Sequence, residues 1–381
     1  YECVPMRFIK HVYKIHTYAQ DGRLFEGKTP VSAFLNSSYD GSFIAGLMEL
    51  RYIQSLPVER IINYFESHGF TLKKPTAHKL MEKASSLFEN LYKCIRQTAL
   101  SDPYKAADET YYKILVPEKN SKGKGVRKGY LWVVVGINTR MIYLLYDDGS
   151  RSEKVILNEL GGCKGIIQSD GYSPYRKLES DAYPHITRIP CLQHIKRKFI
   201  DCGEDDPDAK RIVEMINTLY QNEHKHKIGV DGWTVEQNLV HRKKYAPDIL
   251  GEIKDVLDDI EERGDLLPKS ELKEAITYLR NEWNAVVDIF NYGDTYLDNN
   301  IVERMNRYIS LSRKNSLFFG SHKGAERGAI LYTIALTCRM NKVNLFEYLT
   351  DVINRTAEWQ PNTPLEKYRL LLPDRWEKAN D

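Results

Sequence analysis

The feature that most constrains the fold is a series of strand-like segments in a chain whose other patterns are helical. Residues 108–116 form a β-branched and aromatic run that Pro117 closes. Two apolar runs, residues 130–135 and 141–146, are joined by the short loop 137–140 and predict a hairpin. The series continues as helix, strand, helix and strand, at residues 152–160, 165–170, 175–178 and 185–191.

The order β-β-β-α-β-α-β is typical of an α/β, ribonuclease H-like core with a mixed five-stranded sheet. Right-handed crossovers would place the strand that Asp170 closes beside the strand that Asp108 opens. Open α/β sheets bind their ligands near the ends of such strands. We therefore expect the two carboxylates to face each other near the end of this sheet.

A third acidic residue belongs to a later helix. Residues 298–300 (Asp-Asn-Asn) are competent helix caps, and Glu303 follows about one turn inside the predicted helix. Taken alone, the segment is explained more simply by an exposed ion pair between Glu303 and Arg307. The two upstream aspartates change this interpretation, and Glu303 is predicted to join them.

Three carboxylates with open coordination positions suit Mg²⁺, with Mn²⁺ as an alternative, because Mg²⁺ prefers oxygen ligands and phosphate. A pair of such ions can activate an attacking oxygen and stabilise the leaving oxygen of a phosphodiester. The sequence thus predicts Asp108, Asp170 and Glu303 as catalytic, metal-binding residues. Three uncompensated carboxylates should repel one another, which predicts shifted pKa values in the metal-free protein.

Basic residues are concentrated locally, although the net charge of the 381-residue chain is only +3. One cluster lies in a glycine-containing loop between the first two strands, one follows the last strand, and one follows Glu303. Each could also be a solvated surface, but three clusters around one site favour phosphate contacts. The predicted DNA-binding residues are Lys122, Lys124, Arg127, Lys128, Lys196, Arg197, Lys198, Arg304, Arg307, Arg313 and Lys314.

Four sequence blocks together carry a resemblance to a known family. They are residues 107–110 (ADET), 168–172 (QSDGY), 191–199 (CLQHIKRKF) and 298–304 (DNNIVER), the last continuing through 312–315 (SRKN) and 319–321 (FGS). In this order they resemble the transposases of the IS66 family of bacterial insertion sequences.

The resemblance implies a DDE-type catalytic core in which Asp108, Asp170 and Glu303 form the metal-binding triad. It implies Mg²⁺-dependent cleavage at the ends of a mobile element and strand transfer into target DNA. The implied partners are the terminal repeats, target DNA, further copies of the chain in the assembled complex, and accessory proteins encoded by the element. The implied location is the bacterial cytoplasm, associated with the nucleoid when bound.

Cysteine and histidine residues that could bind a metal occur at two places in the sequence. Relatives in the family carry a cysteine-rich zinc module upstream, but here only Cys3, His11 and His16 remain, without paired cysteines. We therefore predict no structural zinc at this end, and a chain truncated at its N-terminus. Cys191 and His194 form a lone C-x-x-H pair, which we interpret as support for the carboxylates; a core histidine remains equally open.

The patterns divide the chain into five parts: residues 1–40, a β/loop remnant of an upstream module; 41–104, helical; 105–200 with 291–340, the catalytic core; 201–290, an all-α insertion; and 341–381, a C-terminal helical element. The second part is either a helix-turn-helix-like unit or a plain bundle. Within the insertion, breaks are expected at Pro207, residues 229–232, Pro247 and residues 267–268.

Several classes of protein are excluded or kept as rivals. Six cysteines without a C-x-x-C pair predict reduced thiols, and there is no signal peptide or run of about eighteen apolar residues. The rivals to a transposase are a catalytically decayed DNA-binding relative, a ribonuclease H-like nuclease that cuts without joining, and a non-enzymatic helical scaffold.

Overall fold

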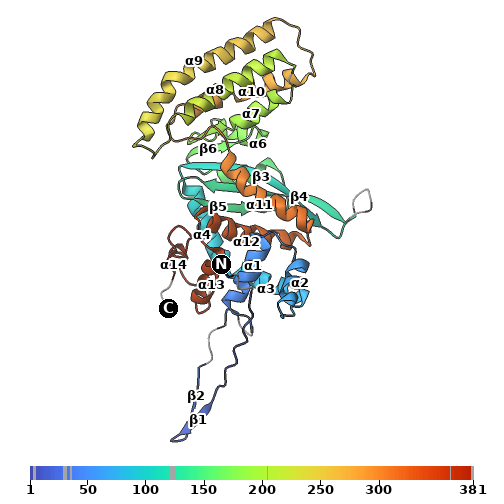
Figure 1. Cartoon of the computed structure of the whole chain (residues 1–381), viewed down its shortest axis with the longest axis vertical. Coiled ribbons are helices and arrows are strands. Elements are labelled where there is room, and N and C mark those ends of the chain that lie inside the picture. Colours follow the sequence, from blue (N-terminus) through green and yellow to red (C-terminus); the bar gives the residue numbers. More distant parts are fainter. Residues whose placement is uncertain are drawn as a thin grey trace.

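A mixed six-stranded sheet forms the centre of the computed structural model (Figure 1). Its strands lie in the order β5-β4-β3-β6-β7, and β8 pairs with β3 as the sixth strand. The pairs β3–β4 and β4–β5 are antiparallel, whereas β3–β6, β6–β7 and β3–β8 are parallel. Their bounds are β3 (Tyr104–Leu115), β4 (Val126–Gly136), β5 (Met141–Leu145), β6 (Gly165–Ser169), β7 (Ile186–Pro190) and β8 (Phe318–Phe319). The predicted α/β core is confirmed, with one more strand than expected.

The structure describes residues 1–2, 6–28, 32–34, 37–119, 123, 125–203, 205–360 and 362–378. Three residues singled out in the sequence, Cys3, Lys122 and Lys124, lie outside these ranges.

Strand β3 begins four residues earlier than predicted, so Asp108 lies within the strand rather than at its start. The cause is Asp102, the residue that follows helix α4 (Glu89–Ser101). Its carboxylate accepts hydrogen bonds from the backbone N–H of Tyr104, at 2.9 Å, and from that of Thr139, at 2.6 Å. Asp102 therefore ties the start of β3 to the turn between β4 and β5.

Helices cover the sheet on the side of the N- and C-terminal segments (Figure 1). Helix α12 (His322–Met340) packs on β5, where the backbone N–H of Leu144 donates to the hydroxyl of Thr333 at 2.9 Å. A two-stranded hairpin, β1 (Thr17–Gln20) and β2 (Arg23–Glu26), extends away from this layer. The other helices here are α1 (Gly41–Tyr52), α2 (Val58–Ser67), α3 (Lys74–Leu87), α13 (Leu345–Thr356) and α14 (Leu365–Arg369). Shorter connections are α5 (Glu153–Leu160), α6 (Ser173–Arg176) and η1 (Lys177–Glu179).

The opposite end of the molecule is a helical lobe (Figure 1), whose hydrophobic core extends onto the sheet through Tyr104, Ile166 and Ile189. It contains α7 (Leu192–Ile200), α8 (Pro207–His224), α9 (Val235–Glu262) and α10 (Glu271–Ile289). The break expected at Pro247 is wrong, because α9 continues through it. A proline inside a helix costs about 3 kcal/mol, which the burial of residues such as Ala246, Leu250 and Ile253 along α9 offsets. None of the described helices is both long and apolar enough to cross a membrane.

Candidate functional site

Asp108 and Asp170 lie at neighbouring positions of the parallel pair β3–β6. Ala106 is opposite Gln168 in the register, two residues before each aspartate. Burial, followed by the nearby charges of Glu109 and Asp170, raises the pKa of Asp108 to about 8. Lost hydration at this half-buried position is the larger cause, and the like charges of the neighbouring acidic groups add to it.

The Asp108 carboxylate is fixed by two donors. One oxygen accepts the backbone N–H of Glu109 at 2.8 Å, and the other accepts the side-chain amide of Asn306 at 2.6 Å. Asn306 belongs to helix α11 (Asn300–Ser316), which lies across β3 (Figure 1). The amide of Asn299, at the start of this helix, donates to the carbonyl of Ala107 at 3.1 Å. These contacts set the position of α11 relative to the aspartates.

Glu303 lies one helical turn before Asn306 on α11. Its Oε1 atom is 3.7 Å from Nε2 of His194, and this oxygen is buried without a hydrogen-bond partner. In the described structure the Glu303 carboxylate therefore lies beside His194, and no ion pair with Arg307, as in the simpler interpretation, is present among the described residues.

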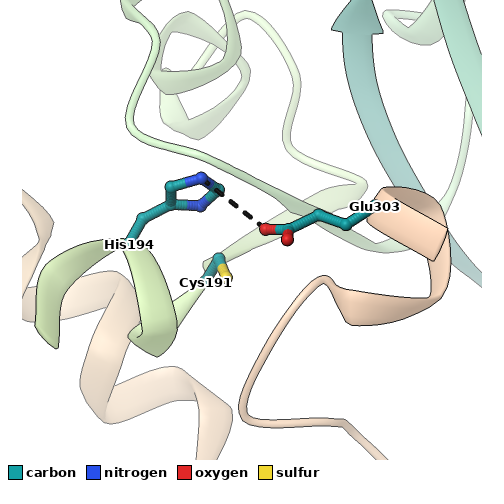
Figure 2. Close-up of side chains that lie close together, drawn as sticks. All are labelled: Cys191, His194 and Glu303. Atoms are coloured by element: carbon teal, nitrogen blue, oxygen red, sulfur yellow. Dashed lines mark ion pairs between the residues drawn. The ribbon is translucent and has the colours of Figure 1, made fainter. Parts of the chain in front are cut away.

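Within the part of the chain that the structure describes, a single group of at least three potential metal ligands has all its ligand atoms within 4.8 Å of one another. It consists of Cys191, His194 and Glu303, and Figure 2 shows the imidazole and the carboxylate pointing toward each other beside the thiol. The structure thus brings Asp108 and Asp170 together but turns Glu303 toward the C-x-x-H pair.

Cys191 occupies the N-cap position of α7 and is buried. Its sulfur accepts the backbone N–H of Asn299 at 3.3 Å, so the start of α7 contacts the start of α11. Burial raises the pKa of the Cys191 thiol to about 11, and the thiol is therefore protonated at neutral pH.

A buried hydrogen-bond network lies where the chain returns from the helical lobe to the sheet, just before α11. The hydroxyl of Tyr104 donates to Gln168 at 2.6 Å and accepts the backbone N–H of Tyr296 at 3.0 Å. The amide of Gln168 donates to the carbonyl of Tyr296 at 2.8 Å. The network joins β3, β6 and the segment before Glu303, which lie far apart in the sequence.

Two charged residues that the sequence analysis did not select also contact the site. Glu109 forms a hydrogen-bonded ion pair with Arg151 and accepts a hydrogen bond from the hydroxyl of Tyr175 at 3.3 Å. Burial raises the pKa of Glu109, despite Arg151. The place of Glu109 directly after Asp108 is the sequence signal that could have identified it. Arg188 has no such signal in the sequence. It is buried and donates to the backbone carbonyl of Asp170 at 2.7 Å.

The predicted basic residues lie mostly on the surface. Helix α11 exposes Arg304, Arg307 and Lys314 at helical spacing. Half-exposed or exposed positions are also occupied by Arg127, Lys128, Lys196, Arg197, Lys198 and Arg313.

Two of these residues belong to an alternating series of cations and rings, here called the cation–aromatic ladder: Arg313, Tyr111, Lys128, Tyr130, Arg151 and Tyr172. The successive distances from charge to ring centroid are 4.0, 4.4, 5.3, 5.1 and 4.1 Å. The ladder ends beside Asp170, which accepts the backbone N–H of Tyr172 at 3.0 Å. It therefore runs from α11 across β3 and β4 to the aspartates.

The donor set of the two aspartates fits Mg²⁺. Their carboxylate oxygens are hard ligands, the type that Mg²⁺ prefers. Arg151, a cationic neighbour of the acidic group Asp108, Asp170 and Glu109, forms its ion pair with Glu109.

The family described as Transposase IS66 family matches residues 36–327, which is most of the chain. Three relatives from Sinorhizobium fredii are similar to it: the uncharacterized protein y4jD at 26% identity, y4hP at 24% and y4qI at 26%. The alignments cover 87%, 100% and 96% of this chain but only 65%, 70% and 69% of these relatives. The match over residues 36–327 shows that the chain belongs to the IS66 transposase family.

Proposed function

We propose that the protein is a DNA transposase with a ribonuclease H-like core, which cuts DNA at the ends of a mobile element and joins the ends to target DNA. The observation that carries the proposal is the register of the parallel pair β3–β6, in which the half-buried Asp108 and Asp170 follow at neighbouring positions. The strand order β5-β4-β3-β6-β7, with the first strand of the core in the middle, supports the ribonuclease H-like assignment.

In this proposal Asp108, Asp170 and Glu303 bind Mg²⁺, and Mn²⁺ would substitute. When bound, the divalent ions would supply charge neutralisation and activation at the phosphodiester. Asn306, which contacts Asp108, and Glu303 belong to the same helix, α11. Glu303 would therefore join the aspartates by a side-chain rotation away from His194. Asn306 would keep the Asp108 carboxylate oriented, and Arg188 would fix the backbone of Asp170.

DNA would lie along the surface that leads to these carboxylates. The cation–aromatic ladder and the exposed Arg304, Arg307 and Lys314 of α11 would contact phosphates, and such contacts give salt-dependent, sequence-independent binding. Pairing of two element ends implies more than one copy of the chain in the active assembly, with or without accessory proteins.

The test is a reaction with Mg²⁺ on plasmid DNA that carries the ends of the element. Wild-type protein is expected to cut at the ends and to produce joined strands, whereas Asp170→Asn should bind DNA and leave it intact. Cut but unjoined products would identify a nuclease instead. Binding without any cleavage would identify a decayed relative, and an Asp170→Asn protein as active as wild type would refute the proposed site.

A further inference from the structure

We propose that Cys191, His194 and Glu303 form a binding site for a thiophilic divalent cation of the Zn²⁺ class, separate from the Mg²⁺ site and sharing Glu303 with it. The sharing rests on the proposed function, whereas the binding itself does not. The sequence offered only a pair of ligands at residues 191 and 194, and folding adds the third from a helix more than a hundred residues away.

The chemistry of the donors distinguishes this site from the aspartates. A sulfur, an imidazole nitrogen and one carboxylate oxygen are the ligand types of zinc sites, whereas Mg²⁺ takes oxygen ligands. Zinc sites with three protein ligands keep a fourth position for water or another ligand. The exposed fraction of the His194 side chain is 30% and that of Glu303 is 26%, so an ion can enter from solvent.

The geometry is close to that of such a site. Zinc bonds of about 2.0–2.3 Å place tetrahedral ligand atoms about 3.3–3.6 Å apart. Nε2 of His194 and Oε1 of Glu303 are 3.7 Å apart, and all three ligand atoms lie within 4.8 Å of one another (Figure 2). Small side-chain rotations therefore suffice to bring the sulfur into range.

An unpaired carboxylate oxygen points to the same place independently. Buried polar atoms are normally hydrogen-bonded, yet Oε1 of Glu303, the oxygen that faces Nε2 of His194, is buried without a partner. The Cys191 thiol would release its proton to solvent when the cation binds, and the backbone N–H of Asn299, which already donates to the sulfur, would stabilise the resulting thiolate. A bound cation would bridge the start of α7 to the first turn of α11.

Because both proposed metal sites use Glu303, a cation bound at one of them should weaken binding at the other. While the carboxylate contributes to the Cys191–His194 site, it is not available to the aspartates. A Zn²⁺-class ion should therefore weaken binding of Mn²⁺, the spectroscopic substitute for Mg²⁺, at the carboxylate site. Loss of the Cys191 ligand should remove this antagonism.

Co²⁺ titration of the metal-free full chain tests the binding, because a cobalt–thiolate bond gives a near-ultraviolet charge-transfer band. We expect the band in wild type, in Cys202→Ser, which removes a thiol near the end of α7, and in Asp108→Asn. Cys191→Ser should abolish it. His194→Ala removes a partly exposed ligand. It should weaken Co²⁺ binding by more than the ~10–100-fold that is typical when a group that only supports a metal ligand is lost. No band in wild type, or a band retained in Cys191→Ser, overturns the site.

Electron paramagnetic resonance of Mn²⁺ tests the sharing without any cleavage assay. Zn²⁺ is expected to release bound Mn²⁺ from wild type and not from Cys191→Ser. Release from both proteins, or from neither, refutes the shared use of Glu303. A wild-type protein that shows the cobalt band but binds no Mn²⁺ would refute the proposed carboxylate site and its sharing, while the Cys191–His194–Glu303 site would stand.

Discussion

Asn306 donates a hydrogen bond from its side-chain amide to the Asp108 carboxylate over 2.6 Å, and this contact joins α11 to the middle of β3. Asn306→Ala would leave an oxygen of the half-buried Asp108 carboxylate without this donor. We expect the free energy of unfolding to fall by about 1–3 kcal/mol. Urea denaturation measures the change, and the exposed Asn300→Ala on the same helix should stay within about 0.5 kcal/mol of wild type. Equal effects of the two substitutions would contradict the assigned role.

Asp108 should make the stability of the metal-free protein depend on pH. Burial raises its pKa from 3.8 to about 8, so the folded state binds the proton more tightly than the unfolded state. This contribution is fully present below pH 3.8 and is lost as the pH rises toward 8. The side chain introduced by Asp108→Asn does not titrate. With a chelator present, the melting temperature of Asp108→Asn should therefore rise relative to that of wild type as the pH increases from 3.8 toward 8. The exposed Asp181→Asn should show no such trend, and a difference that does not change with pH would refute the assignment.

The cation–aromatic ladder predicts a particular pattern of DNA affinity. Lys128→Gln and Arg313→Gln should each reduce the slope of log binding constant against log salt by about 1, as measured by fluorescence anisotropy. Tyr111→Leu should weaken binding because it removes the ring face between these cations, whereas Tyr111→Phe should keep wild-type affinity. The exposed Lys93→Gln on α4 serves as the control. Equal binding by the Leu and Phe variants would show that the ring has no part in orienting the charges.

The buried ion pair between Arg188 and Glu282 should stabilise the junction of sheet and helical lobe. Both side chains are fully buried and their charged atoms are 2.5 Å apart. Arg188→Met leaves the buried Glu282 carboxylate with only the more distant Arg176, at 3.9 Å, among its ion-pair partners in the described structure, and we expect a loss of about 3–5 kcal/mol in the free energy of unfolding. The double variant Arg188→Met with Glu282→Met should lose less, since neither charge remains. A double variant no better than Arg188→Met would mean that Arg188 acts chiefly through Asp170.

Local patterns sufficed for much of the fold. Runs such as residues 130–135 and 141–146 predicted strands because their β-branched and apolar residues are bounded by turn residues. Strand β8 escaped prediction because it has only two residues. It is stabilised by distant contacts: the Phe319 ring packs on Tyr112 with centroids 4.2 Å apart and leaves no space for a side chain at Gly328.

The candidate site was predictable only in part, for a similar reason. Asp108 and Asp170 follow from strand order, because parallel neighbours bring strand positions together. The contact of Glu303 with His194 depends instead on how the helical lobe returns through Tyr296 to the sheet. The spacing of residues along the sequence does not predict this return of the chain. It also does not predict which aromatic rings contact the cations of the cation–aromatic ladder.

Backbone cleavage by hydroxyl radicals from bound Fe²⁺ tests most directly whether the three carboxylates share a metal site. The measurement is best made in Cys191→Ser protein, so that the thiol does not contribute a second site. Cuts near residues 108, 170 and 303, suppressed by excess Mg²⁺ and absent after Asp108→Asn, are the predicted result. Cuts confined to the surroundings of residues 191 and 303, with none near 108 and 170, would contradict the account.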